Sequence, residues 1–475
     1  MRTQLWIDGT WRAGADGEVI PVIDPSNGEQ IALVASGTPA DATAAVDAAA
    51  AAQVRWAAEP PRVRGEVLRA CWQTMIDHTD ELADLIVREH GKPLAEAKGE
   101  VAYAAEFFRW NSEEAVRIHG SVSTAPSGAN RFIVRHPPVG VVVMVTPWNF
   151  PAAMITRKLA PALGAGNAAV VKPAAETPLT ALRIAELMAD AGVPAGVVNV
   201  VPARDPGGWF DAAIAHQATR MVSFTGSTDV GRQLLRKCAD RVLKVGMELG
   251  GNAPFIVLDD ADIDAAVTGA MVAKMRHSAE TCVAANRFFV HTGVATEFAE
   301  KLAAAMSAVK VGNGFEDGVG CGPLITAAAL DKTVELVGAA VRAGAGVLTG
   351  GSRIDRDGWF FAPTVLDDVA PDSPLTQREI FAPVAPLVRF RDTDQMIGWA
   401  NDTEMGLAGY LYSRDLGRGL AVAERLQCGM VGINRGFMSD PAAPFGGMKQ
   451  SGLGREGASE GIYEFCETQF IAAQW

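Results

Sequence analysis

Hydrophobic and polar positions divide the chain into three stretches of different character. Over residues 1–30 they alternate, with glycine and proline between them, which predicts short strands joined by turns. From Pro39 to about His119, apolar residues recur at spacings of three and four, and this pattern predicts a series of helices. Beyond Pro138, short apolar runs bounded by turns alternate with amphipathic segments, so strands and helices are expected in alternation.

The alternating region predicts two successive α/β units. In the first unit we expect helices such as 179–191 and 230–239, between strands at residues 139–145, 168–171, 197–201, 221–224 and 243–247. A second unit begins near Gly250, with helices at 262–275 and 296–308 and strands at 253–257, 287–291 and 387–390. Such alternation forms parallel, doubly wound sheets, which bind ligands at the carboxyl ends of their strands. The last residues, 461–475, are expected to form a strand.

Length and charge narrow the class of protein. A chain of 475 residues is too long for one compact core, so two or three domains are expected. With 49% hydrophobic and 20% charged residues, the composition is that of an ordinary globular enzyme. The net charge of -13 repels phosphate backbones and argues against nucleic acid as a partner. A small anionic substrate remains possible, because a local arginine cluster can override the overall sign.

The cysteines and the N-terminus bear on location and metals. The six cysteines are scattered, with no CxxC pair and no metal-ligand spacing, so we expect reduced thiols, no disulfide framework and no metal. The first residues show no signal peptide. No apolar run approaches the roughly 20 residues that a membrane span needs. We therefore expect a cytoplasmic protein without a membrane partner.

Two segments are candidates for ligand contacts at strand ends. In TPWNFP at 146–151, Asn149 follows an expected strand and can donate a hydrogen bond, although an Asx turn that caps the next helix is the simpler interpretation. In FTGSTDVGRQ at 224–233, Gly226 and Ser227 open a helix whose N–H groups and dipole favour phosphate. By itself this segment is more typical of an ordinary capped helix, because its spacing is not the common GxGxxG of nucleotide-binding loops.

Two further segments carry candidate reactive groups. In MELGGNAPFIV at 247–257, Glu248 ends an apolar strand, where burial would raise its pKa and suit a general base; the alternative is a carboxylate that caps a backbone amide. In AETCVAANRFFV at 279–290, Cys282 lies between an expected helix and strand. A lone cysteine is more often a small core residue than a nucleophile, and no cysteine–histidine triad signature supports it.

Read together, the segments resemble one family. The order PWNFP, GSTxxG, ELGGNAP and a cysteine followed by Asn-Arg, with Glu379-Ile380-Phe381 and PFGGMKQSGLGREG at 444–457, resembles the aldehyde dehydrogenase superfamily over essentially the whole chain. The resemblance implies an α/β fold of three parts. These are a Rossmann-type cofactor-binding domain (1–118 and 138–248), an α/β catalytic domain (249–440) and a β-strand oligomerisation arm (119–137 and 461–475). An arm with apolar edge strands implies a homodimer or homotetramer.

The resemblance also implies roles for single residues. Cys282 matches the nucleophile that forms a thiohemiacetal and then a thioester, Asn149 the oxyanion donor, and Glu248 the base that activates water. A nicotinamide cofactor, NAD or NADP, is implied without a metal. The positions that match its contacts are Thr146, Trp148, Lys172, Ala175, Gly226, Ser227, Glu379 and Phe381. A CoA-acylating enzyme, or a binding protein without chemistry, is disfavoured because all three reactive groups are present.

Departures from the family pattern carry their own expectations. Many NAD-preferring members have a glutamate where this chain has Ala175, so NADP should be accepted or preferred, with Lys172 free to pair with its phosphate; the alternative is that Glu176 takes the glutamate's role. Glu280 replaces a usual glutamine and would raise the thiol pKa if it faces Cys282. Ala382, where glycine is common, implies a minor packing change. Ala284, where some members have a second cysteine, implies no disulfide between neighbouring cysteines.

Finer resemblance points to a substrate. Residues 104–120, 149–163 and 443–457 look most like succinate-semialdehyde dehydrogenases, whose distal carboxylate is bound by arginines and a hydroxyl. The matching positions are Arg157, Arg276 and Ser439. Alternatively, Arg157 forms a salt bridge and Arg276 is a cation at a helix C-terminus. Glutarate semialdehyde, or an aromatic or aliphatic aldehyde, remains the alternative substrate.

Overall fold

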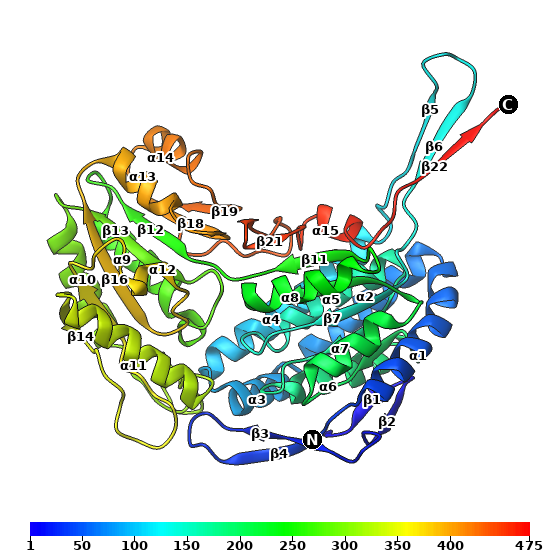
Figure 1. Ribbon diagram of the computed structural model, residues 1–475, viewed down its shortest axis with the longest axis horizontal. Coiled ribbons are helices and arrows are strands. Elements are labelled where there is room, and N and C mark those ends of the chain that lie inside the picture. Colours follow the sequence, from blue (N-terminus) through cyan, green and yellow to red (C-terminus); the bar gives the residue numbers. More distant parts are fainter.

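The computed structural model describes residues 1–475, and its N-terminal part contains the short strands and helices that the pattern predicts (Figure 1). The strands are β1 (Leu5–Ile7), β2 (Thr10–Arg12), β3 (Val19–Ile23) and β4 (Gln30–Ala35). The helices are α1 (Pro39–Ala58), α2 (Pro61–Asp77), α3 (Thr79–His90) and α4 (Leu94–Glu114). Helix α1 begins with a capping box in which Thr38 and Asp41 satisfy each other's backbone N–H groups.

An eight-stranded sheet, in the order β2-β1-β9-β8-β7-β10-β11-β21, forms the first of two layered bodies. Its parallel strands are β7 (Val141–Val145), β8 (Ala168–Lys172), β9 (Val198–Val200), β10 (Thr219–Thr225) and β11 (Lys244–Glu248). The helices that follow them are α5 (Ala153–Ala165), α6 (Pro178–Asp190), α7 (Pro206–Ala215) and α8 (Thr228–Ala239). The chain reverses its direction across the sheet between β7 and β10, which is where such sheets bind ligands.

Both faces of this sheet are buried, which explains the continuous apolar run of β7. Val142 and Met144 pack in a core with α2 to α6, whereas Val141 and Val143 pack on the other side with α1, α7 and α8. Because neighbouring residues of a strand point to opposite faces, a strand covered on both sides needs apolar residues at every position.

A seven-stranded sheet in the order β14-β15-β16-β13-β12-β18-β19 forms the second body. All its pairings are parallel except that of β14, and its strands are β12 (Ala253–Val257), β13 (Ala285–His291), β14 (Gly346–Thr349), β15 (Thr364–Asp367), β16 (Val384–Phe390), β18 (Ala408–Tyr412) and β19 (Met430–Ile433). One face packs against α9 (Ile263–Met275) and α10 (Ala295–Ser307), and the other against α11 (Ala327–Arg342), α13 (Thr393–Asn401) and α14 (Leu416–Ala423).

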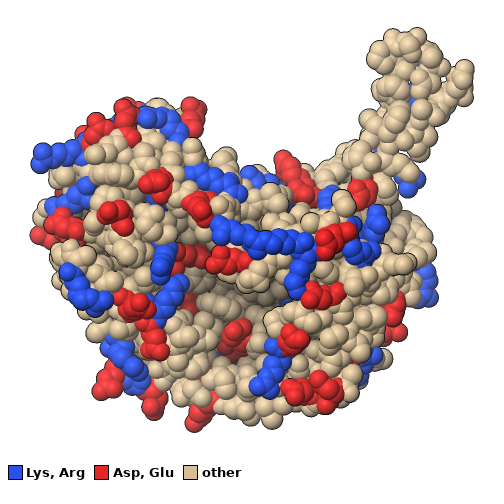
Figure 2. Space-filling view, viewed as in Figure 1, with Lys and Arg blue, Asp and Glu red and all other residues tan.

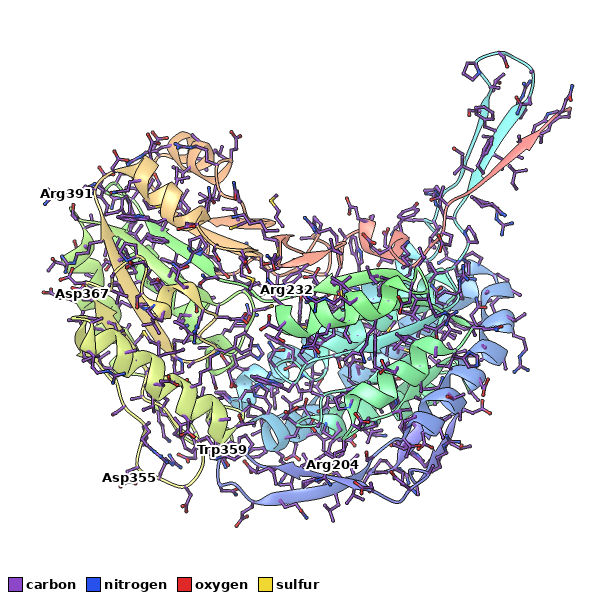
Figure 3. All side chains as sticks on the ribbon, in the orientation of Figure 1. Arg204, Arg232, Asp355, Trp359, Asp367 and Arg391 are labelled. Carbon is purple, nitrogen blue, oxygen red and sulfur yellow. The ribbon has the colours of Figure 1, made fainter.

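Short segments join the two bodies. Strand β21 (Gly452–Leu453) returns to the first sheet and pairs antiparallel with β11, and β17 (Met405–Gly406) pairs with β20 (Met448–Lys449). Arg232 of α8 forms an ion pair with Glu404 at 2.8 Å. The Trp359 N–H donates to the Pro25 carbonyl at 3.1 Å, on the opposite side of the junction (Figure 3). The relative placement of the two bodies therefore depends on a few discrete contacts as well as on the chain connections.

A three-stranded sheet projects from the molecule, with β5 (Ser121–Thr124), β6 (Arg131–Arg135) and β22 (Gln469–Ala473) in the order β22-β6-β5 (Figure 1). On the face shown in Figure 2 this arm carries almost no charge. Val122 is 67% exposed and Phe470 is 57% exposed. The tail differs from the prediction in one respect: it starts with helix α15 (Glu460–Tyr463), because Ile462 is buried against α5. The domain boundaries given above stay a prediction.

The predicted elements are confirmed to within a few residues at their ends, with β12 at 253–257 as expected. None of the helices combines the length and apolarity that crossing a bilayer requires.

Candidate active site

Residues of the first sheet reach the candidate site from the carboxyl ends of neighbouring strands. Asn149 follows β7, Gly226 and Ser227 follow β10, and Glu248 is the last residue of β11. Ser227 caps helix α8 by accepting a hydrogen bond from the Val230 N–H at 3.4 Å. Helix α8 thus begins at the point where the strand order reverses. Its first N–H groups and the positive end of its dipole lie at this point, an arrangement that favours phosphate binding.

Residues of the second sheet reach the same place from the amino ends of its strands. Cys282 lies three residues before β13, and Glu379 and Phe381 precede β16. Gly251 lies against the backbone of the cysteine segment, so closely that a Cβ atom at residue 251 would collide with the Cys282 carbonyl oxygen. Its N–H donates a hydrogen bond to Glu379 Oε1 at 3.0 Å. The absence of a side chain at residue 251 allows the reactive cysteine to approach the end of the first sheet.

Residues from both sheets line one cavity of about 270 Å³ between the two bodies. Figure 2 shows the surface hollowed between them. Of the residues proposed from the sequence, those that line the cavity are Trp148, Asn149, Gly226, Ser227, Cys282, Glu379 and Phe381. The rings of Trp148 and Phe381 meet edge to face at 5.7 Å, with Phe381 in the left-handed backbone region at a φ of 53°. Thr146, Lys172, Ala175, Glu248 and the three substrate candidates lie outside the lining.

The Cys282 thiol is half-buried, and its surroundings favour the protonated form. Burial raises the pKa of Cys282 to about 12; the negative charges of Glu379 and Glu248 add to the rise, and Arg157 opposes it. A thiol of this kind is inert until a base or a nearby positive charge promotes ionisation.

Glu248 is a buried carboxyl whose surroundings raise its pKa. It is 4% exposed, and its Oε2 atom has no hydrogen-bond partner. Burial and the neighbouring Glu456 raise its pKa well above the usual range. Glu456 itself pairs with Arg157 and Lys158, each at 2.6 Å, and these charges keep its pKa low despite burial. The two adjacent acids therefore differ, because the surroundings favour the ionised form of Glu456 and the protonated form of Glu248.

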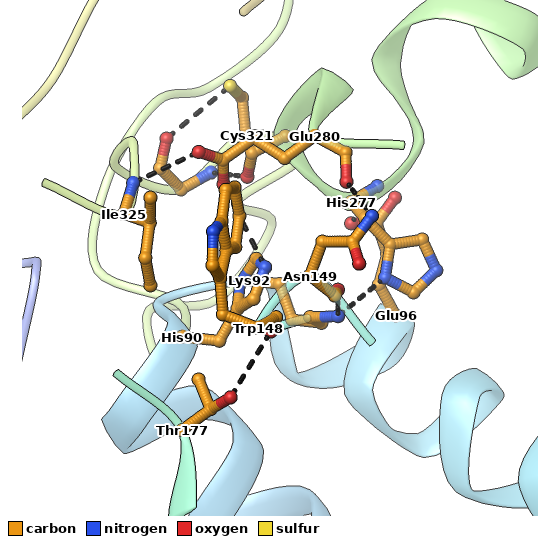
Figure 4. Close-up of polar contacts among 12 residues, drawn as sticks. His90, Lys92, Glu96, Trp148, Asn149, Thr177, His277, Glu280, Cys321 and Ile325 are labelled. Atoms are coloured by element: carbon orange, nitrogen blue, oxygen red, sulfur yellow. Dashed lines mark hydrogen bonds and ion pairs between the residues drawn. The ribbon is translucent and has the colours of Figure 1, made fainter. Parts of the chain in front are cut away.

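Asn149 contacts the segment that carries the cysteine. Its Nδ2 donates to the Glu280 carbonyl at 3.0 Å (Figure 4), while its Oδ1 has no partner. The Glu280 side chain is fully buried, and its Oε1 accepts from the Ile325 N–H at 3.0 Å. Burial raises the pKa of Glu280 well above its usual value and favours the neutral carboxyl, and the largest contributions to the raised pKa of Cys282 come from other groups.

Three of the positions matched to the cofactor, Thr146, Lys172 and Ala175, lie at or just beyond the carboxyl ends of β7 and β8. The Thr146 N–H donates to the Lys172 carbonyl at 3.2 Å, and Lys172 Nζ donates to the Pro173 carbonyl at 2.9 Å. Burial lowers the pKa of Lys172 to about 8, and the charge of Glu176 opposes that shift. Ala175 is half-buried and adds no charge beside this lysine.

The three residues matched to the substrate carboxylate have different environments. Arg157 is 2% exposed and forms the ion pair with Glu456, as the salt-bridge alternative expected. Arg276 ends α9 and lines a second cavity with Tyr103 and Phe437; it forms no ion pair, and its guanidinium lies 4.4 Å from the Phe437 ring centroid. Ser439 is buried two residues beyond Phe437. The charges of both arginines act on the Cys282 thiol and on Tyr103.

Several buried polar residues of the site were not singled out by the sequence pattern. Glu456 lies in the quoted segment 444–457, so a signal was present. Lys92 and Glu100 lie in a charged helical stretch that is typical of an exposed surface, yet both are at most 1% exposed. His277 precedes the cysteine and is also buried. Only the tertiary structure brings these residues together.

Known proteins share this combination of two parallel sheets with a cysteine, an amide and a carboxyl between them. The chain belongs to the aldehyde dehydrogenase family, which matches residues 11–471. The family resemblance and the fold expected from the sequence are thus confirmed, and the protein is an enzyme that acts on a small aldehyde.

Individual relatives are similar over nearly their full length. The chain is 52% identical over 441 residues to a succinate-semialdehyde dehydrogenase of Paenarthrobacter nicotinovorans, covering 93% of this chain and 98% of that protein. It is 49% identical over 472 residues to a glutarate-semialdehyde dehydrogenase of Pseudomonas putida, covering 99% and 97%. The crystal structure of an NADP-dependent enzyme from Escherichia coli superposes with a TM-score of 0.98 at 48% identity, covering 100% of this chain and 98% of that one.

Proposed function

We propose that the enzyme oxidises an aldehyde with a distal carboxylate, succinate semialdehyde first and glutarate semialdehyde as the alternative, to the corresponding acid. Arg276 carries this proposal, because its guanidinium lines a cavity near Cys282 and forms no ion pair, although Glu96 and Glu100 line the same cavity. A charged group in such a place is costly unless a ligand neutralises it, and a guanidinium fork binds a carboxylate in bidentate fashion. The relatives named above act on semialdehydes that carry a carboxylate, which agrees with this site.

The chain's own groups suit the steps of acyl formation. The Cys282 sulfur, once ionised, attacks the aldehyde carbon, and the positive charge of Arg157 favours the thiolate. The alkoxide that develops would be stabilised by two donors, the Cys282 N–H and the Asn149 amide, which contacts the segment of the cysteine at the Glu280 carbonyl. Ser227, Glu379, Phe381 and Trp148 would hold a nicotinamide cofactor, which would supply the hydride acceptor needed for the thioester to form.

Glu248 suits the final step. In its ionised form it accepts a proton from water, and the hydroxide equivalent attacks the thioester, releases the acid and returns the Cys282 thiolate. Because burial and Glu456 raise the pKa of Glu248, the carboxylate is a stronger base than an exposed glutamate. The pairs Glu456–Arg157 and Glu456–Lys158 hold the neighbouring acid in place beside it.

The substrate proposal is tested by Arg276→Ala, assayed with succinate semialdehyde and with an uncharged aldehyde. Loss of a charge-assisted contact should lower kcat/KM for the semialdehyde about 10- to 100-fold and leave the uncharged substrate nearly unchanged. Arg157, the proposed second contact, is expected to behave differently: its removal leaves Glu456 without one partner and should impair both substrates. An equal loss with both aldehydes in Arg276→Ala would show that this arginine is structural.

We propose that NADP is accepted or preferred over NAD. Ala175 lacks the carboxylate that would repel a 2′-phosphate, and Lys172 beside it can pair with that group. Introducing Ala175→Glu should therefore lower kcat/KM with NADP at least about tenfold and raise the relative use of NAD. Glu176→Ala is the matched variant, because it reveals whether Glu176 already takes this role. A strong NAD preference of the unmodified enzyme at low cofactor concentration would contradict the proposal.

We further propose that the enzyme is a cytoplasmic homodimer or homotetramer. The exposed apolar residues of the arm, such as Val122 and Phe470, support self-association through the open edges of the three-stranded sheet. The six cysteines are unpaired, as is typical of a reducing compartment.

A further inference from the structure

Lys92 is a fully buried cation that the proposed chemistry does not use. Its Nζ atom donates to Glu100 Oε2 at 2.5 Å and to the Asn149 carbonyl at 2.7 Å, and it lies 2.9 Å from His277 Nδ1 (Figure 4). It also lies 4.7 Å from the centre of the Phe150 ring. All three hydrogen-bonding positions of the ammonium group are therefore occupied, and one of them fixes the backbone of the proposed oxyanion donor.

Residues that contact Lys92 form further hydrogen bonds on both sides of the site. Glu100 Oε1 accepts from the Ala152 N–H at 2.8 Å and from the Ala153 N–H at 3.3 Å, which anchors the start of α5 just after Asn149. On the other side, the His277 N–H donates to Glu96 Oε2 at 2.8 Å. The cluster Lys92–Glu100–His277 thus connects the turn that presents Asn149 with the segment that leads to Cys282.

That segment has a costly backbone conformation. His277, Ser278 and Ala279 are three consecutive non-glycine residues in the left-handed region, with φ angles of 52°, 56° and 68°. Side chains with a Cβ atom rarely adopt this conformation, and it persists only where the surroundings impose it. Besides the contacts of His277, the Ser278 hydroxyl accepts from the Gly322 N–H at 2.8 Å. The turn delivers the Glu280 carbonyl to the Asn149 amide at 3.0 Å, two residues before the nucleophile.

We propose that Lys92, together with Glu100 and His277, is a positioning residue that sets the Asn149 amide opposite Cys282. Lys92 itself lines neither of the two cavities, and it acts through the Asn149 carbonyl and the strained turn. The proposal rests on the roles proposed for Asn149 and Cys282, and it holds for whichever aldehyde the enzyme oxidises. A shift of about 1 Å between reacting groups lowers rates by as much as about 100-fold, so a device that fixes their separation is consequential.

Lys92→Met removes the three hydrogen bonds while keeping the length of the side chain. We expect kcat to fall about 10- to 100-fold, because the oxyanion donor is misplaced, with cofactor affinity unchanged. The decisive measurement is a double-mutant cycle with Asn149→Ala: if Lys92 acts through Asn149, its replacement costs little further rate once the amide is gone. Lys98→Met is the control, because Lys98 is exposed on helix α4, which begins two residues after Lys92, and pairs only with Asp80.

Glu100→Gln is the second variant in case Lys92→Met fails to fold, since it keeps the size of the side chain and presents an NH₂ group to Lys92. It should show the same loss of kcat and the same dependence on Asn149. Losses that multiply independently with Asn149→Ala, or a full kcat in either folded variant, would overturn the positioning role. A full rate in Asn149→Ala alone would instead contradict the proposed oxyanion role, so the two failures are distinguishable.

Discussion

Cys282→Ser is expected to lower kcat for aldehyde oxidation by more than about a thousandfold. The serine hydroxyl is a much weaker acid than the thiol, and the surroundings that already raise the pKa of Cys282 to about 12 would keep it protonated. Cofactor binding should persist, since the other lining residues Ser227, Glu379 and Trp148 remain. The formation of reduced nicotinamide, followed by its absorbance with an aldehyde present, measures the loss.

Cys428→Ser is the matched control for this experiment. Cys428 is half-buried, as Cys282 is, but lines neither cavity, so its replacement should leave kcat nearly unchanged. Acid quenching of the unmodified enzyme during turnover should yield a peptide whose Cys282 carries the mass of the acyl group. A Cys282→Ser variant with the kcat of the unmodified enzyme would refute a covalent route.

Glu248→Gln is expected to lower steady-state kcat about 100- to 10,000-fold, the range typical of a lost general base. If Glu248 acts chiefly in thioester hydrolysis, the variant should still release one equivalent of reduced nicotinamide per active site in a rapid first turnover. The steady rate after this burst is then slow. Stopped-flow absorbance separates the two phases, and Glu460→Gln, at an exposed position, is the control.

The pH dependence of hydrolysis follows from the same residue. The pKa of Glu248 is raised by burial and by Glu456, and only the ionised form accepts a proton from water. The hydrolytic rate should therefore rise with pH through this raised pKa and fall as the carboxyl becomes protonated on the acid side. Glu248→Gln should remove this dependence. A variant that hydrolyses its thioester at the original rate and with the original pH profile would place the base elsewhere.

The sequence could predict those parts of the fold in which local pattern and tertiary environment agree. Strand β12 at Ala253–Val257 is an unbroken apolar run buried on both faces, and no other element type suits that run between two turns. The position of Asn149, Ser227 and Glu248 at strand ends likewise followed from strands that alternate with helices.

Other parts depend on contacts that no local pattern encodes. Lys92 and Glu100 have the sequence context of a solvated helix, and only the packing of α4 against the segment before Cys282 buries them. The left-handed turn at 277–279 contains no glycine, so nothing in its residue types indicates that conformation. The sequence also does not decide whether Glu280 raises the pKa of the Cys282 thiol. That effect depends on the direction of the Glu280 carboxyl, which accepts a hydrogen bond from the Ile325 N–H.

The reacting groups are divided between two independently layered bodies. Asn149 and Glu248 belong to the eight-stranded sheet, whereas Cys282 and Arg276 precede a strand of the seven-stranded one, and pairs such as Arg232–Glu404 and Trp359–Pro25 bridge the gap. The relative position of the catalytic groups consequently depends on the interface between the two bodies more than on the stability of either core. Substitutions at this interface, far from Cys282, are therefore expected to change kcat while each body keeps its fold and its stability.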